Sequence, residues 1–593
     1  MLAAMLSACG QGAPATDGAA SATSAASASE APPASGAADA GEPSSEPSSG
    51  APGATQPEGG GAAGIATTAS IDGKYDPPIT VSTVRFITDQ MQSNGVDRKP
   101  DVMEDNLWYR DYRDILGINV SNAWEVPESQ YRDKLNTQIA ANDLPDFFLC
   151  YEPSQLKQVV EYGMAADMTD IFEEHAAPFT REMMEVDNKV GVSQATFGGR
   201  LMALPQVNGN RDSANLWWVR KDWMDNLGIA EPTTMEEFIE MCRRFAADDP
   251  DGNGAADTVG MGVTKELFGG TGYILPFAEG YGAYLGNYDW VDAGGGQLGY
   301  GSVQPAARDA LEALAGMYRD GILDSEFIVK DNSKISEEII AGRIGVVGGQ
   351  HWQAFWPLPD VRANEPEAEW IALPILPGGS NSAPKTMLQG SAGRAFVVNA
   401  NCASPEAVVK LYNYYYLKDC ALSPEWEEQY HGQIDVDPNW PVDQYFAWSA
   451  VSSFYPMQNM FIHIGVEKFL NGGDDSDMGV FWVSDNVKRI KDYLDNGNEG
   501  EYATSIWSGP GDYSGEGRAH YYENNGMFLQ NAYIGAPTDS AVQYQVTLDD
   551  LRLTTFTQII MGEKPISEFD SFVQQWRTLG GDSITSEVNE AAK

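Results

Sequence analysis

This chain has few of the residues that commonly build metal centres, redox sites and nucleotide sites. Only 37 of its 593 residues are Lys or Arg, and it has 5 His and 5 Cys. No cysteine pair has CxxC spacing and no histidine pair has HExxH spacing, which excludes the common zinc-ribbon, dithiol and zinc-protease motifs. GxxxxGK[ST] and GxSxG segments are also missing, so P-loop nucleotide chemistry and serine hydrolysis have no support.

The shortage of basic residues leaves a formal net charge of −48, because 85 residues are Asp or Glu. Phosphate backbones and anionic membrane surfaces need basic patches, so nucleic acid is excluded as a partner. A solvated acidic surface that keeps an exposed protein soluble explains this charge, and a cationic ligand is the alternative. The five cysteines are Cys9, Cys150, Cys242, Cys402 and Cys420. A disulfide between Cys402 and Cys420 is possible, but spacing alone cannot establish it.

Long apolar runs are missing too, since no stretch offers 18 consecutive apolar residues for a membrane span. The start, MLAAMLSAC, is a short apolar run without the basic region of a complete signal peptide. Leu6-Ser7-Ala8-Cys9 resembles the lipobox of bacterial lipoproteins, in which the cysteine is lipidated. We therefore expect residues 1–9 to be a signal remnant that ends in a lipid anchor at Cys9, with an accidental apolar start as the alternative.

Residues 10–74 consist largely of Ala, Ser, Gly, Pro and Glu. This composition lacks the aliphatic and aromatic side chains that offset chain entropy, so it predicts a disordered linker. A Gly/Ser-like coil of this length reaches roughly 40–45 Å. Such a tether would hold a folded body clear of a lipid surface.

From Ile79 onward the chain alternates strand and helix patterns. ITVSTVRFIT predicts a buried strand, residues 107–116 have helical apolar spacing that ends at Gly117, and INVSNAWE resumes strand alternation. A second helix is expected over 131–139, and LPDFFLC predicts a third strand. This order indicates an α/β fold with a parallel sheet.

Two further helices are marked by their termini. Thr234 and Glu237 have capping-box spacing ahead of an apolar stripe from Met235 to Phe245. Near the end, a second stripe precedes Gly580-Gly581 and includes Ile566, Phe569, Phe572, Val573, Trp576 and Leu579. Both stripes are expected to face the core.

The order of short segments resembles the extracellular solute-binding lipoproteins of bacterial ABC transporters, of the large carbohydrate-binding type. The segments that carry the resemblance are DLPDFFL, YGMAADMTDIFEEHA, GGRLMALP, LWWVRKDWMDNLGIAEPTTMEEF, DPDGNGAAD, YRDGILDSEF, AGRIGVVGGQHW, ALPILPG, NCASPEAVVKLYNYYY and FTQIIMGEKPISEFDSFVQQWRTLGG. The resemblance implies a two-lobed periplasmic-binding-protein-like fold of type 2, with ligand held in a cleft between the lobes. It places lobe I at 75–205 with a return at about 370–430, lobe II at 206–369, and a helical region at 431–593 that completes the lobes.

An acidic loop follows the helix that begins after Thr234. Asp249, Asp251, Asn253 and Asp257 occupy positions 1, 3, 5 and 9 of an EF-hand-like loop, with the Ala255 carbonyl at position 7. Position 12 is Gly260 instead of Glu, and Thr258 stands where related binding proteins often have an acidic ligand. We expect a structural Ca²⁺ here, and an acidic turn without metal is the alternative.

Sugar sites combine aromatic platforms with planar polar groups, and several aromatic residues stand near predicted strand ends. Trp352, after GRIGVVGGQH, is the first candidate for stacking on a ligand, against a core or surface role. Asn106, Trp108 and Tyr109 begin a helix after the first strand, where the carboxyl end of a sheet opens to a cleft. Asp89, Gln90 and Trp507 are further candidates.

The pair Trp217 and Trp218 precedes Arg220. Adjacent strand residues face opposite sides, so we expect one Trp of the pair in the cleft and the other packed in the core, with Trp218 taken as the cleft residue. Arg220 could donate a fork of hydrogen bonds to a ligand, but an ion pair within or between the lobes is equally consistent.

These patterns predict a monomeric, membrane-anchored protein that captures a carbohydrate, in particular an oligosaccharide, and delivers it to an ABC permease on the extracellular face of the bacterial membrane. A peptide or another polar solute is the alternative ligand. A secreted glycoside hydrolase is the enzyme alternative, but 85 acidic residues always offer some pair of carboxylates, so their availability is no evidence. A surface adhesin would predict repeats of 20–50 residues, and none is found.

Overall fold

The computed structural model describes residues 73–92, 96–97, 101–185, 189–207, 210–388, 394–419, 445–454, 457–473 and 481–592. Cys9, the lipobox, almost all of the 10–74 segment and Cys420 therefore lie outside the described residues. Within these ranges every helix is too short or too polar to serve as a membrane span. The described cysteines Cys150, Cys242 and Cys402 form no disulfide with one another.

Lobe I is the part of the chain that shares one hydrophobic core between residues 81–207 and 395–451. Strand β1 pairs in parallel with β2, with Ile79 opposite Ile118, as expected for the first two strands of a parallel sheet. The third predicted strand, β3, does not join them, which corrects the expected parallel sheet. A separate three-stranded sheet has the order β3-β14-β6, in which both pairings are antiparallel. The elements of lobe I are β1 (Ile79–Ile87), α1 (Asp89–Met91), α2 (Leu107–Asp111), a π-helical turn (Tyr112–Leu116), β2 (Ile118–Pro127), α3 (Glu128–Ala141), β3 (Phe147–Cys150), α4 (Pro153–Glu161), α5 (Thr169–His175), α6 (Pro178–Glu185), α7 (Val190–Gln194), β4 (Thr196–Phe197), β5 (Arg200–Leu201), β6 (Leu204–Pro205), β14 (Ala395–Val398), α13 (Glu406–Asp419) and a 3₁₀ turn (Tyr445–Trp448).

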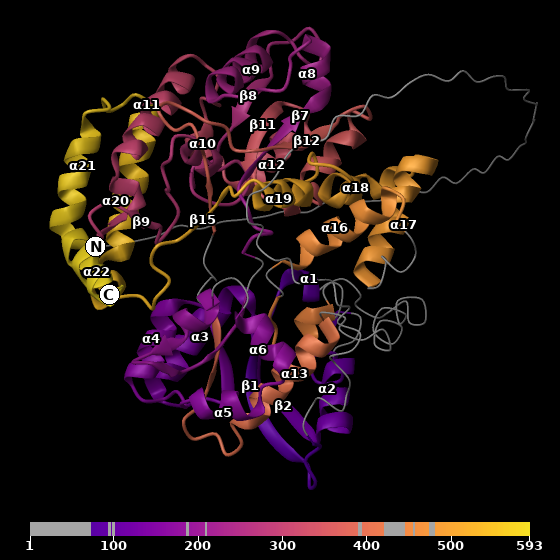
Figure 1. The fold of residues 1–593 in the computed structure, drawn as a ribbon, viewed down its shortest axis with the longest axis vertical. Coiled ribbons are helices and arrows are strands. Elements are labelled where there is room, and N and C mark those ends of the chain that lie inside the picture. Colours follow the sequence, from indigo (N-terminus) through magenta and orange to yellow (C-terminus); the bar gives the residue numbers. More distant parts are fainter. Residues whose placement is uncertain are drawn as a thin grey trace, which may run out of the picture. The chain divides into compact units, whose positions relative to one another are not determined.

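Lobe II is built on a four-stranded sheet of order β12-β7-β11-β8 (Figure 1). The sheet is mixed, because β7 is antiparallel to both neighbours whereas β11 and β8 are parallel. Its first elements are β7 (Leu216–Arg220), α8 (Lys221–Leu227), α9 (Met235–Ala247), β8 (Val259–Gly262), α10 (Leu275–Gly280), β9 (Trp290–Asp292), β10 (Leu298–Tyr300), a 3₁₀ turn (Gly301–Val303), α11 (Pro305–Arg319), a 3₁₀ turn (Phe327–Val329), α12 (Asn332–Ile340), β11 (Ile344–Gly349), the 3₁₀ turn η8 (His351–Ala354), a 3₁₀ turn (Leu358–Ala363), β12 (Trp370–Leu373) and β13 (Thr386–Leu388).

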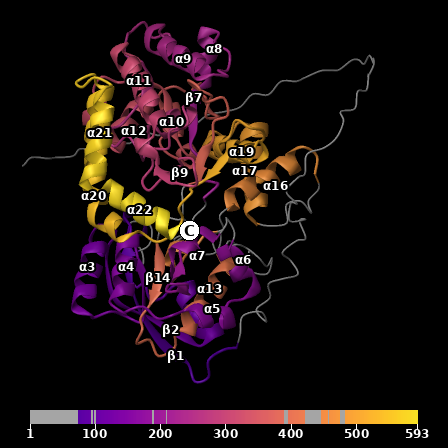
Figure 2. The ribbon, with the colours of Figure 1, turned by 60° about the vertical axis from the view of Figure 1, so that its left-hand side comes forward.

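The C-terminal region packs on lobe II. Helices α16 to α18 share a core with one face of the sheet, and α20 to α22 share a core with the other. Helix α20 runs beside α11 in both views (Figures 1 and 2). The elements are α16 (Gln458–Leu470), α17 (Phe481–Asn496), a 3₁₀ turn (Glu499–Glu501), α18 (Tyr502–Ser508), α19 (Gly515–Asn524), β15 (Phe528–Gln530), which pairs with β13, α20 (Asp539–Ile560), α21 (Glu568–Trp576), a π-helical turn (Arg577–Gly581) and α22 (Asp582–Ala591).

One predicted lobe boundary differs from the structure. Lobe I does not return at about 370, because β12 pairs with β7 in the sheet of lobe II, and the return is made by β14. The region after 431 contributes to both lobes, because Trp448, Ala450 and Val451 belong to the lobe I core whereas α16 to α18 and α20 to α22 pack on lobe II.

The two helices predicted from their termini are confirmed. The Thr234 side chain accepts a hydrogen bond from the Glu237 amide and begins α9, whereas the Glu237 carboxylate accepts from the amide and hydroxyl of Thr233. The last stripe is buried at Phe569, Phe572 and Trp576. Leu579 differs from the prediction, since it is 46% exposed in the π-helical turn that continues into α22.

Candidate functional site

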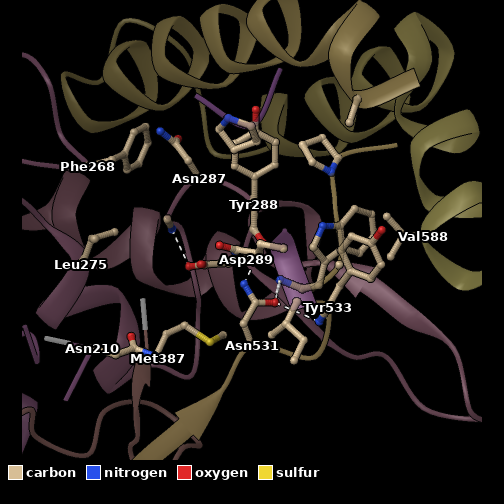
Figure 3. Close-up of a pocket in the computed structure, with 18 of the residues that line it drawn as sticks. Asn210, Phe268, Leu275, Asn287, Tyr288, Asp289, Met387, Asn531, Tyr533 and Val588 are labelled. Carbon is tan, nitrogen blue, oxygen red and sulfur yellow. Dashed lines mark hydrogen bonds between the residues drawn. The ribbon is translucent and has the colours of Figure 1, made fainter. Parts of the chain in front are cut away.

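A cavity of about 460 Å³ opens in lobe II beside the loop that joins α10 to β9 (Figure 3). Two lining residues, Pro153 and Gln194, belong to lobe I, and the others come from lobe II and its C-terminal region. The polar lining residues are Gln194, Asn210, Ser213, Asn215, Glu279, Asn287, Tyr288, Asp289, Gln350, Asn531, Tyr533 and Thr538. Its wall is therefore rich in amides and hydroxyls.

Arg552 on α20 holds the loop that carries three of these polar residues. This buried guanidinium donates to the carbonyl of Leu285 at 3.0 Å and to the amide oxygen of Asn287 at 2.6 Å. It also donates to the hydroxyls of Tyr300 and Ser302. The loop is thus positioned by a side chain from a helix more than 250 residues later in the chain.

Asn531 fixes the other end of the same loop. Its amide oxygen accepts from the backbone of Trp290 and Tyr533, each at 3.1 Å, and its amide nitrogen donates to the Tyr288 carbonyl at 2.9 Å (Figure 3). Asp289, between these residues, accepts from the Gly286 amide at 2.7 Å, and burial raises its pKa to about 6. The polar groups of this wall are preorganised by hydrogen bonds within the protein.

Glu279 contributes a carboxyl group from α10. Its Oε1 accepts from the Asn215 side chain at 2.7 Å and from the Met387 amide at 2.9 Å. Among the described residues, its Oε2 has no hydrogen-bond partner. Burial raises the pKa of Glu279 to about 8, so the carboxyl group is largely protonated at neutral pH and offers a donor to the cavity.

The charge of the wall restricts what it can bind. None of the described residues that line the cavity is Lys or Arg. A carboxylate or phosphate on a ligand would therefore lose water without gaining an opposite charge. Amides, hydroxyls and the rings of Phe268, Tyr288 and Trp290 suit an uncharged, hydroxyl-rich molecule.

Gln350 joins the cavity to the predicted stacking residue Trp352. The Gln350 side chain lines the cavity, donates to the Ser213 carbonyl at 3.0 Å and accepts from the Trp352 indole at 3.0 Å. Trp352 lies in η8 with 36% of its surface exposed, beside Phe355 and Trp356, which are both 44% exposed. The assignment of Trp352 to the ligand site stays a prediction, and its indole is oriented by a residue of the cavity wall.

The aromatic residues after β1 are placed differently from the prediction. Trp108 has no exposed surface and stacks on Tyr415 of α13 with ring centroids 5.4 Å apart, so it offers no face to a ligand. Tyr109 is also buried, and its hydroxyl donates to Asn122 at 2.7 Å. Asn106 is the buried N-cap of α2. The correction has a physical reason: α13 covers the surface that the strand pattern left open.

The tryptophan pair on β7 also requires a correction. Trp217 and Trp218 do face opposite sides, but both are fully buried, because β7 is an inner strand whose two faces are covered by separate cores. Trp218 therefore does not face a cleft, and its indole donates to the Gln350 carbonyl at 2.9 Å. Arg220 is 1% exposed and pairs within lobe II with Asp222 and Glu365, each at 2.6 Å.

The remaining ligand candidates stay predictions. Asp89 lies at the start of α1 and lines a second cavity together with Arg132, Tyr151 and Arg394 in lobe I. Gln90 belongs to the same helix, and its side chain is outside the described part of the structure. Trp507 is only 7% exposed, so it packs beneath the surface residues and contributes little surface itself. Its indole donates to His351 at 2.9 Å, and its ring centroid lies 5.3 Å from that of Phe355.

The acidic loop after α9 is tightly turned. Asp249, Gly252 and Gly254 have positive φ, and the Gly254 amide donates to the Asp249 carboxylate. Burial, followed by the neighbouring Asp249 and Asp257, raises the pKa of Asp251. Gly260, at position 12, lies in β8 against the Cys242 carbonyl, where a Cβ would come within 2.1 Å. No side-chain ligand can stand at that position.

The polar residues that line the cavity were missed by the sequence reasoning. They come from loops such as GYGAYLGNYDW and LQNAYIGAP, which have no catalytic or metal-ligand spacing. The only available signal was composition, since Asn, Tyr and Gly are concentrated there. Such loops converge only through long-range contacts, as with Arg552 and Asn531.

The chain is similar to several known proteins. Lipoprotein LipO of Bacillus subtilis (strain 168) is 22% identical over 481 residues, which cover 80% of this chain and 86% of LipO. The ABC-transporter substrate-binding protein FusA of S. pneumoniae, solved in complex with kestose, superposes with a TM-score of 0.57 at 15% identity, covering 87% of this chain and 99% of FusA. The alginate-binding protein AlgQ2, solved without calcium ion, gives a TM-score of 0.56 at 14% identity, covering 87% of this chain and 98% of AlgQ2.

The two structural similarities confirm the fold that the order of segments predicted. Residues 117–419, just over half of the chain, match the family described as bacterial extracellular solute-binding protein. The chain belongs to this family of bacterial extracellular solute-binding proteins.

Proposed function

We propose that this chain captures an uncharged oligosaccharide in the lobe II cavity and delivers it to the permease of an ABC importer. The observation that carries the proposal is the cavity wall, in which amides, hydroxyls and aromatic rings are held in place and no described lining residue is Lys or Arg. FusA, an ABC-transporter substrate-binding protein of similar fold, was solved with kestose, which supports the same class of ligand.

The size and surroundings of the cavity favour an oligosaccharide. A volume of about 460 Å³ is in the ordinary range for small-molecule sites. A longer ligand would leave the cavity past Gln350 and reach the exposed ring of Trp352. The amide groups in the wall would hydrogen-bond the hydroxyls, and the indole would pack on the apolar face of a sugar ring.

A peptide is the weaker alternative. Its terminal carboxylate needs a cationic partner or a set of free backbone amides. The described wall offers no such cation, and the Gly286 amide is already paired with Asp289. A uronate is disfavoured for the same reason.

The test is calorimetry of the full chain with neutral oligosaccharides, uronate oligosaccharides and short peptides. We expect heat from one or more neutral oligosaccharides and none from the charged compounds. Binding of the charged compounds alone would contradict the proposal. The hydrolase alternative is tested in the same samples, because cleavage of the offered glycans would create new reducing ends, whereas a binding protein returns its ligand intact.

The route to the membrane is part of the same proposal. Lipidation at Cys9, followed by the Ala/Ser/Gly/Pro segment, would anchor the chain at the extracellular face of the cell. LipO is named a lipoprotein, which supports this route. The full chain expressed with Cys9→Ser should move from the membrane fraction to the medium, and an unchanged distribution would contradict the anchor.

We further propose a structural Ca²⁺ in the loop after α9. Asp249, Asp251, the Asn253 amide, the Ala255 carbonyl and Asp257 would supply five oxygens, and water would complete the six to eight that Ca²⁺ takes. Gly260 removes the strongest ligand of an EF-hand, so we expect modest affinity.

Calorimetry of chelator-treated protein tests the calcium site. We expect one Ca²⁺ per chain in the wild type and at least tenfold weaker binding in Asp251→Asn. Asp292→Asn, on β9 outside the loop, is the control and should bind as the wild type does. Absence of calcium-dependent heat in the wild type would remove the site without touching the sugar-binding proposal.

A further inference from the structure

Helices α16 and α19 bring two histidines and a glutamate together in the C-terminal part of lobe II. The two helices neighbour each other in both views (Figures 1 and 2). His463 and Glu467 are one turn apart on α16, and His520 lies on α19. The Glu467 carboxylate is 3.8 Å from Nε2 of His463 and 3.9 Å from Nδ1 of His520, and one ligand atom from each residue lies within 4.8 Å of the others.

These three groups face one another without hydrogen bonds between them. Distances of 3.8 and 3.9 Å are longer than any hydrogen bond between nitrogen and oxygen. His463 is 1% exposed, and Nε2 is the ring nitrogen that lies nearest the Glu467 carboxylate. The ligand atoms of the three residues lie within 4.8 Å of one another, an arrangement that a metal ion between them would bridge.

Gly517 on α19 lies close to the His463 ring. Gly517 makes this approach of the helices possible, because a Cβ at that position would lie 3.1 Å from Cε1 of His463.

We propose that His463, Glu467 and His520 bind a divalent transition metal of the zinc class. Two imidazole nitrogens and one carboxylate oxygen form a donor set that suits zinc, whereas calcium and magnesium require oxygen ligands. Zinc holds such donors at about 2.0–2.2 Å, so a pair of them on one ion lies about 3.3 Å apart. Each distance from Glu467 to a histidine must shorten by roughly half an ångström, and the separation of the two histidine nitrogens, which is within 4.8 Å, by up to about 1.5 Å.

The site is open on one side. The side chains of His520 and Glu467 are 23% and 31% exposed, so the ion can enter and water can complete the coordination. The net charge of −48 favours cations at this surface. The calcium loop shares no residue with this cluster, so the two sites can be tested separately.

A metal ion at this location would also stabilise the position of α19. Helix α19 also carries Glu516, whose carboxylate lies 2.9 Å from Nδ1 of His351, the residue before Trp352. A metal that joins α16 to α19 would hold the helix that supports the surface at Trp352. The proposal concerns metal binding alone and stands whether or not the cavity binds a sugar.

Zinc chloride added to the chelator-treated full chain, in saturating calcium, tests the site by calorimetry. We expect one equivalent of zinc to bind, with affinity reduced at least tenfold in His520→Gln and in Glu467→Gln. His175→Gln, on α5 in lobe I, is the matched control and should bind as the wild type does. Cobalt should give d–d absorption that the wild type shows and His520→Gln lacks.

His463 is buried, so the two more exposed ligands are the variants of choice, and circular dichroism melting without metal checks that each is folded. Lost zinc binding in either folded variant, with binding retained in the control, supports the site. Zinc binding unchanged in the double variant Glu467→Gln/His520→Gln, or no zinc binding by the wild type, overturns it.

Discussion

Two segments of this protein have a similar local pattern, but the aromatic residue is buried in one and partly exposed in the other. Each follows a buried strand: residues 106–109 come after β1, and residues 350–356 come after β11. Each begins with an amide side chain that caps a short helical turn, Asn106 in one case and Gln350 in the other. In lobe I the aromatic residue that follows, Trp108, is fully buried, whereas in lobe II Trp352 is 36% exposed.

The difference comes from what a distant part of the chain supplies. Helix α13 lays Tyr414 and Tyr415 against Trp108, with ring centroids 6.2 and 5.4 Å away. At the second segment, Trp507 of α18 packs behind Phe355 and leaves the outer ring surfaces accessible. Whether an aromatic residue at a strand end is a core residue or a ligand candidate therefore depends on which distant side chains pack on it.

The largest expected effect separates the two tryptophans by stability. Trp108→Ala should lower the free energy of unfolding by about 3–5 kcal/mol, because it empties a fully buried aromatic site. Trp352→Ala should cost less than about 1 kcal/mol, because the ring is partly exposed. Urea unfolding of both variants measures this difference, and equal losses would break the comparison.

The next largest effect on stability is expected at Asn106, the capping residue of α2. Asn106→Ala should cost about 2 kcal/mol, because it removes the acceptor for the Tyr109 amide and a donor to the carbonyls of Val102 and Trp448, all of them buried. Asn106→Asp, which keeps the cap acceptor but not the donor, should recover part of this loss only near the pH at which the carboxyl group is protonated. Chemical unfolding at two pH values checks both expectations.

In the second segment, His351 is expected to make the stability of the protein depend on pH. Burial lowers the pKa of His351 to about 4, against the attraction of Asp212, so between about pH 6.5 and 4 the folded state binds fewer protons than the unfolded state. The stability contributed by the neutral ring is therefore lost as the pH falls through that window. His351→Asn keeps an acceptor for the Trp507 indole. As the pH falls through this window, the free energy of unfolding of this variant should decrease by about 2 kcal/mol less than that of the wild type.

Urea unfolding at pH 7 and pH 4.5 measures that difference. His175→Asn, in lobe I, serves as the matched variant and should follow the wild type. Parallel loss of stability in His351→Asn and the wild type would show that the His351 environment has no part in acid sensitivity.

The smallest expected effect, in free energy, is on binding. Trp352→Ala should weaken the bound oligosaccharide by at least tenfold, or about 1.4 kcal/mol. Tyr162→Ala, which removes a 59% exposed aromatic residue from lobe I, should leave the affinity unchanged. Calorimetry with the best neutral ligand decides, and equal affinities of wild type and Trp352→Ala would place the ligand away from η8.

Much of the local structure could be predicted from patterns. The helix after Thr234, the strand at Ile79 and the opposite orientations of Trp217 and Trp218 all follow from caps and periodicity, and the structure contains them. The lobe boundary near 370 could not be predicted, because β12 is assigned by its pairing with β7, about 150 residues earlier in the chain. Register between distant strands leaves no local signal.

The sequence by itself determined the acidic balance, the secondary structure of most segments and the family, since these depend on composition, short-range hydrogen bonding and the order of segments. Only the tertiary structure decided which aromatic side chains are accessible and which polar loops form the cavity wall. The physical reason is that burial depends on the side chains that pack on a residue, and here they come from far along the chain: α13 for Trp108, Arg552 for Asn287 and Asn531 for the loop at Tyr288.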